Sequence, residues 1–230
     1  MLNELLVPKE LRRNHASIRK AGVIRTGKLL IEKTLEACGL ASLADTDVLD
    51  VGCGTRFTET LINRKKFALK SYTGIDVDKS VIDWLKANVE AKDERFHYAH
   101  WDVVNALYNK GGSGFDGNSR LPLDRDKKFD LIWIFSVITH QYPEGSTALF
   151  KILRNYVNAE GRMFFTVFID ADVDKFRDAR EDQPLMYAYY QREYLLEILS
   201  ECGWKVEKTL PPDTENTPPL HQDCFLCSPK

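Results

Sequence analysis

The stretch Val48-Leu49-Asp50-Val51-Gly52-Cys53-Gly54-Thr55 decides the fold. It reads as a buried strand that runs into a turn with two glycines, and a helix-like segment follows it. In an open α/β sheet, ligands bind outside the carboxyl ends of the strands. Glycine lets the backbone come close to a ligand because no Cβ stands in the way. The stretch therefore predicts a strand, a ligand-binding turn and a helix.

A second strand-like segment, Tyr72–Asp76, ends in an acid 22 residues after Gly54. A carboxylate at this place can accept hydrogen bonds from both hydroxyls of a ribose, so a nucleoside is expected. The dinucleotide fingerprint would need a third glycine where Phe57 stands. Nicotinamide chemistry is disfavoured for that reason. The alternative for Asp76 is a plain helix cap.

Strand-like and helix-like segments alternate along the chain, which predicts an α/β fold with a largely parallel sheet. Loops are expected at residues 109–128 and 211–222. The expected strands are Asp47–Val51, Tyr72–Asp76, Phe96–Ala99, Phe129–Ser136, Gly161–Ile169, Lys205–Leu210 and Cys224–Cys227, and the expected helices are Thr26–Cys38, Thr58–Ala68, Lys79–Ala91, Pro143–Val157 and Gln191–Cys202.

Together these segments resemble the class I S-adenosylmethionine (SAM)-dependent methyltransferases. The matching pieces are Val48–Gly54, Gly74-Ile75-Asp76, Trp101-Asp102, Phe129–Trp133 and Glu160–Met163. The resemblance implies a Rossmann-like, doubly wound sheet of seven strands with an antiparallel last strand and helices on both faces. It also implies SAM as the cofactor, whose tail is an amino acid rather than a pyrophosphate.

The resemblance assigns a role in cofactor binding to particular residues. Asp50 and the backbone of Gly52 and Gly54 would hold the methionine part of SAM, and Asp76 would hold the ribose. Val77, Asp102 and Val103 would surround the adenine, while Phe135 and Ser136 would line the site near the sulfonium. Arg56 stands where the family often has a third glycine, so its side chain is expected to point away from the cofactor. Asp102 alone could also be a plain turn acid.

The catalytic candidate follows the fourth strand, in the stretch Ser136-Val137-Ile138-Thr139-His140. Methyl transfer needs an acceptor aligned with the methyl group, and a hydroxyl acceptor also needs a base. His140 is the expected general base because histidine titrates near neutral pH. The resemblance points the same way, because many family members that methylate sugars and other hydroxyl-bearing small molecules show a similar Ser-Val-x-Thr-His stretch. The alternative is a structural histidine that bonds to a neighbouring loop.

Substrate contacts are expected from Tyr187, Tyr190 and His221. Tyrosine offers a flat apolar face with a polar tip, which suits a sugar or a ring. The tyrosines of the stretch 186–190 could equally begin the next helix. The charged stretch 170–183 and the basic residues of the N-terminal arm are candidates to cover the site.

Bulk properties narrow the function classes. The chain has 230 residues with 32 basic and 34 acidic side chains, which argues against a basic nucleic-acid-binding surface. We find no apolar run of membrane-spanning length and no secretory signal. The five scattered cysteines do not form a disulfide framework, and Cys224-Phe-Leu-Cys227 lacks partners for a metal site. A cytoplasmic protein without metal, membrane or nucleic-acid partners is expected, as a monomer or homodimer.

These observations predict one domain over residues 1–230, with an arm (1–23), a SAM-binding core (24–170) and a C-terminal part (171–230). The expected function is SAM-dependent methyl transfer to a small molecule, with a hydroxyl oxygen of a sugar-like or natural-product-like acceptor favoured. Transfer to nitrogen or to a macromolecule is one alternative, although an Asn/Asp-Pro-Pro-Tyr type motif is missing after the fourth strand. A non-catalytic SAM-binding module is the other.

Overall fold

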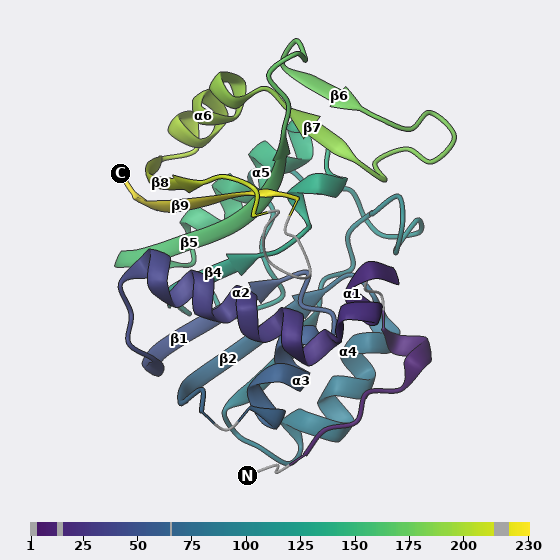
Figure 1. The fold of residues 1–230 in the computed structure, drawn as a ribbon, viewed down its shortest axis with the longest axis vertical. Helices are drawn as coiled ribbons and strands as arrows, with labels where there is room; N and C mark the ends of the chain where they lie inside the picture. Colours follow the sequence, from purple (N-terminus) through teal and green to yellow (C-terminus); the bar gives the residue numbers. More distant parts are fainter. Residues whose placement is uncertain (1–3, 13–15, 65, 214–220) are drawn as a thin grey trace.

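The fold is described from a computed structural model that covers residues 4–12, 16–64, 66–213 and 221–230. Parts of the predicted arm (1–3 and 13–15) and of the predicted 211–222 loop (214–220) lie outside the described residues. Within the described residues, one sheet of nine strands runs through the molecule (Figure 1). The strands are β1 (Leu43–Val51), β2 (Leu69–Asp76), β3 (Phe96–His100), β4 (Phe129–Ile134), β5 (Val157–Ile169), β6 (Phe176–Asp178), β7 (Ala188–Tyr190), β8 (Trp204–Leu210) and β9 (Asp223–Pro229).

The sheet has the predicted arrangement in its main part. Its order is β3-β2-β1-β4-β5, all parallel, and β9 then pairs with β5 in the antiparallel direction. Strand β8 pairs with β9, so the seven predicted strands and the antiparallel last strand are confirmed. The order changes direction between β1 and β4, which opens a crevice where the carboxyl ends of the two strands diverge.

Two further strands, β6 and β7, were not predicted. They form an antiparallel pair, and β7 extends the sheet beside the end of β5, with Phe168 opposite Tyr189. Residues 188–190 of the stretch 186–190 therefore form a strand, and the next helix begins only at Arg192, so the helix-start interpretation was wrong. Strands of three residues are too short to show an alternating pattern in the sequence.

Helices cover both faces of the sheet, as predicted (Figure 1). One buried cluster joins the sheet to α2, α3 and α4, and the other joins it to α5 and α6. Helix α2 ends at Gly39, and α5 begins with Pro143 in its first turn. The bounds are α1 (Ala16–Ala21), α2 (Val23–Cys38), α3 (Arg56–Asn63), α4 (Lys79–Leu85), α5 (Pro143–Arg154) and α6 (Arg192–Glu201), with short turns η1 (Lys9–Leu11), η2 (Lys86–Glu90, a π-helical continuation of α4) and η3 (Ile138–His140).

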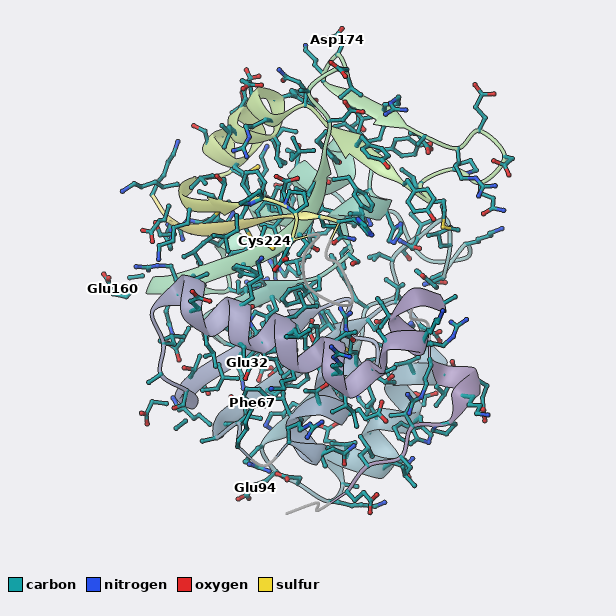
Figure 2. The ribbon with its side chains drawn as sticks, viewed as in Figure 1. Glu32, Phe67, Glu94, Glu160, Asp174 and Cys224 are labelled. Carbon is teal, nitrogen blue, oxygen red and sulfur yellow. The ribbon has the colours of Figure 1, made fainter. Side chains whose placement is uncertain are left out.

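Alternating side chains of the strands supply the two clusters. Val48 of β1 belongs to the cluster under α2 and α3, and its neighbour Leu49 belongs to the opposite one. Cys224 and Cys227 divide in the same way, as expected for positions three apart on a strand. Both are buried as free thiols within the sheet, where Figure 2 labels Cys224.

The segment before α1 packs against α3. Leu5 is buried, its N–H donates to Oδ1 of Asn63, and its carbonyl accepts from Nδ2 of the same side chain. Arg12 forms an ion pair of 2.6 Å with the buried carboxylate of Glu59. In the described residues, no helix is long and apolar enough to span a membrane. Nor do the described residues contain three or more His, Cys, Asp or Glu side chains placed to hold a metal ion.

Candidate active site

A cavity of about 1070 Å³ lies at the carboxyl ends of β1, β2, β4 and β5. Its wall includes the turn after β1, the residues that follow β2 and β4, the end of β5 and the adjoining part of β7. Helix α2 closes another side with Leu29 and Lys33. Ligand sites in proteins commonly have volumes of roughly 300–1,000 Å³, so this cavity is at the upper end of that range.

The turn after β1 depends on two glycines with left-handed backbone. Gly52 has a φ of +72° and Gly54 a φ of +47°, where a side chain with a Cβ is strained. A Cβ on Gly52 would lie 2.5 Å from a methyl carbon of Val137, whereas a Cβ on Gly54 would meet no described atom within 4 Å. Gly54 therefore presents bare backbone to the cavity that it lines.

Asp76, at the end of β2, connects this turn to the second strand. Its Oδ2 accepts from the N–H of Gly54 at 2.8 Å and its Oδ1 from the N–H of Asp78 at 2.9 Å. Burial raises the pKa of Asp76, although these backbone N–H groups oppose the rise. Each oxygen keeps a lone pair for a ligand. The helix cap belongs to Asp78, whose carboxylate accepts from the N–H of Ser80 at 3.0 Å.

Asp50 lies beneath the turn rather than on the wall of the cavity. It is 1% exposed, and its Oδ2 accepts from the hydroxyl of Tyr72 at 2.5 Å. Burial raises the pKa of Asp50 to about 7, against the lowering effects of the Tyr72 hydrogen bond and the Arg56 charge. The arrangement gives Asp50 a part in supporting the turn, and Asp50 is not among the residues that line the cavity.

Of the two predicted residues after β3, one lines the cavity and the other does not. Val103 lines the cavity, but Asp102 is exposed, and its carboxylate accepts from Nδ2 of Asn109 at 2.9 Å. The predicted 109–128 loop folds back here, because the N–H of Val104 donates to the carbonyl of Ser113 at 2.8 Å. This fold-back brings Tyr108 and Phe115 to the cavity, and no sequence motif indicated them.

Ser136 follows β4 in a left-handed conformation, with a φ of +56°. Its N–H donates to Oγ1 of Thr166 on β5 at 2.9 Å, and its hydroxyl lies 3.0 Å from Nε2 of Gln222. Left-handed backbone at a residue other than glycine is sparsely populated and is often found at functional sites. Ser136 lines the cavity together with Phe135.

His140 lies in the short turn η3 and lines the cavity. Its Nδ1 is 2.8 Å from the carbonyl oxygen of Leu185. A carbonyl can only accept, so Nδ1 of the neutral ring carries the proton and Nε2 keeps its lone pair. Burial lowers the pKa of His140 below 6.5, although contacts with the backbone of Leu185 and Met186 oppose the shift. The ring is therefore mostly neutral at pH 7.

The backbone of Leu185 is itself held by a carboxylate, which binds its N–H. Leu185 has a φ of +61°, and its N–H donates to Oδ2 of Asp178 at 2.8 Å. Asp178 ends β6, so the unpredicted strand pair carries the residue that fixes the partner of His140. Sequence reasoning missed Asp178 because nothing local connects it to His140.

Aromatic side chains form the cavity wall beside β7. Phe168 stacks on Tyr189 with ring centroids 5.1 Å apart, and Tyr187 meets the same phenylalanine edge-on at 6.1 Å. All three are half-buried and line the cavity. Tyr190 does not line the cavity. Its ring is buried, and its hydroxyl donates to the carbonyl of Gln141 at 2.8 Å.

The structure thus brings most of the sequence-predicted site residues to one cavity. Those on its wall are Gly52, Gly54, Asp76, Val77, Val103, Phe135, Ser136, His140, Tyr187 and the exposed His221. Asp50, Asp102 and Tyr190 lie outside the wall. Arg56 is among the residues of the wall, and its side chain lies between α2 and α3, with its guanidinium 4.9 Å from the centre of the Phe57 ring.

The fold and cavity define a nucleoside-binding α/β protein of the Rossmann-like type. A family model described as a methyltransferase domain matches residues 22–209. The chain therefore belongs to the methyltransferase domain family. This membership confirms the resemblance to the class I SAM-dependent methyltransferases and the expectation of an enzyme of that class.

Similar solved structures have the same fold. The 1,6-didemethyltoxoflavin-N1-methyltransferase of Burkholderia thailandensis, solved with 1,6-didemethyltoxoflavin and S-adenosylhomocysteine, has a TM-score of 0.62 at 15% identity over 94% of this chain and 81% of that chain. The glycopeptide N-methyltransferase MtfA has a TM-score of 0.59 at 12% identity over 91% of each chain. A SAM-dependent methyltransferase from Clostridium acetobutylicum has a TM-score of 0.56 at 15% identity over 88% of this chain and 89% of that chain. At these identities the likeness concerns the fold alone.

Proposed function

We propose that the protein transfers a methyl group from SAM to a hydroxyl oxygen of a small molecule, with His140 as the general base. The observation that carries the proposal is the hydrogen bond of 2.8 Å between Nδ1 of His140 and the carbonyl of Leu185. It leaves the basic Nε2 on a ring that lines the cavity. A neutral imidazole at the cavity wall is suited to take a proton from an acceptor.

The residues of the turn suit SAM as the cofactor. Gly54 offers backbone without a side chain, and Asp76 offers a carboxylate for the ribose hydroxyls. Val103 and Val77 add apolar wall for the adenine. Two of the similar structures were solved with S-adenosylhomocysteine, which supports the same cofactor here. When bound, SAM supplies a methyl group on a positively charged sulfur.

His140 performs the proton transfer that a hydroxyl acceptor requires. Its Nε2 would take the hydroxyl proton as the acceptor oxygen bonds to the methyl carbon of bound SAM, whose bond to sulfur would break with the electron pair left on sulfur. The resulting imidazolium is stabilised by the Leu185 carbonyl, which accepts from Nδ1. General bases of this kind contribute about 10²–10⁴-fold to the rate.

The aromatic wall favours an acceptor with a flat or apolar face. Phe168, Tyr187 and Tyr189 present half-buried rings to the cavity, and ring faces of this kind stack against sugars and aromatic molecules. Gln141 and His221 add polar groups to the wall. An apolar wall with polar groups placed beside it is typical of small-molecule sites.

Nitrogen is the second candidate for the acceptor atom. Two of the similar structures are N-methyltransferases, one for 1,6-didemethyltoxoflavin and one for a glycopeptide. A base at His140 could also take the proton from a protonated amine. The two candidates differ in the acceptor that is methylated, which an activity screen separates directly.

The test is a screen of hydroxyl-bearing and amine-bearing small molecules with methyl-labelled SAM, in wild type and in His140→Gln. We expect methylated oxygen products, and a turnover about 10²-fold or more lower in the variant. S-Adenosylhomocysteine should bind both proteins equally. Products methylated only on nitrogen would show that nitrogen, and not oxygen, is the acceptor atom. Normal turnover in His140→Gln would refute the role of His140 as the base.

A further inference from the structure

Arg56 occupies an unusual place for a cation. It is the first residue of α3, directly after the glycine turn, and it lines the cavity. Its stem passes close to α2: a Cβ built on Gly27 would lie 3.4 Å from Cγ of Arg56. Its guanidinium lies 4.9 Å from the centre of the Phe57 ring. The side chain is therefore held between α2 and α3 at one end of the cavity.

The guanidinium has no hydrogen-bond acceptor among the described residues. Arg56 is only 8% exposed, and its Nε is fully buried without a partner. Glu59 pairs with Arg12 through Oε1, while its Oε2 has no partner, and Asp50 accepts from Tyr72; neither carboxylate forms a hydrogen bond with Arg56. Burial lowers the pKa of Arg56 to about 10, so the group stays charged at neutral pH. A buried charge without hydrogen bonds is strongly unfavourable unless a ligand supplies them.

Its neighbour points to the same kind of ligand. The hydroxyl of Thr55 is also buried without a hydrogen-bond partner, and Thr55 lines the cavity. Thr55 precedes α3 but makes no side-chain cap to it. The N–H groups at the start of a helix favour an anion. The Arg56 guanidinium and the Thr55 hydroxyl can therefore both donate to an anion at this helix start.

We propose that Arg56, with Thr55, binds the α-carboxylate of the methionine part of the cofactor. This inference rests on the proposed use of SAM. Asp76 and Arg56 line the same cavity on two sides of the glycine turn, so a ligand with a nucleoside and a carboxylate can engage both. An arginine at the place of the third glycine then supplies a binding group that glycine could not.

The test is calorimetric titration with S-adenosylhomocysteine and with its decarboxylated analogue, which keeps the adenosine, the sulfur and the amine. In Arg56→Met, we expect the affinity for S-adenosylhomocysteine to fall about 10-fold or more, as loss of a charge-assisted hydrogen bond does. The affinity for the analogue should change by less than about 2-fold. Asp76→Ala is the matched control, because it should lower the affinity for both ligands.

Each outcome decides the question. Equal losses for both ligands, or no loss for either, would overturn the proposal and leave Arg56 as a structural partner of Asp50. If Arg56→Met does not fold, Arg56→Lys keeps the charge while it loses the planar fork, and the same selective loss is expected at a smaller size. A wild-type protein that binds neither ligand would refute the proposed cofactor, and the role of Arg56 with it.

Discussion

Nδ1 of His140 lies 2.8 Å from the carbonyl oxygen of Leu185, 45 residues later in the chain. The contact joins the turn after β4 to the segment that connects β6 with β7. It fixes both the orientation of the imidazole and the nitrogen that carries its proton. The reactivity proposed for His140 therefore depends on a backbone conformation elsewhere in the molecule.

Asp178→Ala should lower turnover without weakening the binding of the cofactor. The carboxylate of Asp178 accepts from the N–H of Leu185, whose φ of +61° is strained for leucine. Without it, the carbonyl that orients His140 is free to turn, and a displaced general base loses part of its effect of about 10²–10⁴-fold. We expect turnover to fall by about 10-fold with unchanged affinity for S-adenosylhomocysteine.

Asp174→Ala is the control for that variant. Asp174 is exposed at the outer tip before β6, where Figure 2 labels it. Turnover should stay at the wild-type level in this variant. If Asp178→Ala also keeps wild-type turnover, Leu185 is held by the rest of the segment and Asp178 is no positioning residue.

The pH dependence of turnover should show a single rise below neutrality. Burial lowers the pKa of His140 from 6.5, and only the neutral imidazole can accept a proton. Turnover should therefore increase as the pH rises through a value below 6.5 and should be constant around pH 7. His140→Gln should lack this rise. A rise centred above pH 7 in the wild type would indicate a different base.

The cofactor half of the site could be predicted from the sequence because its signals are local. Gly52 and Gly54 lie in the turn after β1 and Asp76 ends β2, and parallel strands bring their ends to one edge. Asp50 shows the limit of the same reasoning. The pattern identified the end of the strand, but only the structure shows that its carboxylate turns under the glycine loop to meet Tyr72.

The acceptor half depends on contacts between distant segments, which the sequence does not display. The strands β6 and β7 are three residues long, so no periodicity marks them. Tyr189 joins the wall only because β7 pairs with the end of β5, and the same pairing buries its neighbour Tyr190. Arg56 was interpreted from its departure from the family pattern, and the unpartnered state of its guanidinium required the structure.

Asp76→Ala should weaken the binding of S-adenosylhomocysteine by about 1.5–3 kcal/mol, since hydrogen bonds to a charged group are lost. Titration calorimetry measures the change. Asp83→Ala is the control, because Asp83 is an exposed carboxylate of α4 that pairs with Lys79 and does not line the cavity. Its affinity for S-adenosylhomocysteine should stay at the wild-type level. Equal affinities in Asp76→Ala and wild type would rule out a contact between Asp76 and the ribose.

Gly54→Val should abolish cofactor binding because the valine side chain would enter the cavity that Gly54 lines. This effect can be separated from backbone strain. Both Gly54 (φ +47°) and Gly39 (φ +67°) have left-handed backbone, and a Cβ at either position would meet no described atom within 4 Å. Valine at either glycine should therefore lower the free energy of unfolding by a similar amount, roughly 1–2 kcal/mol. Of these two glycines, Gly54 lines the cavity and Gly39 ends α2. Thermal unfolding and titration with S-adenosylhomocysteine on both variants should show matched destabilisation, with binding lost in Gly54→Val alone. Binding retained in a folded Gly54→Val protein would mean that the cofactor does not pass over this turn.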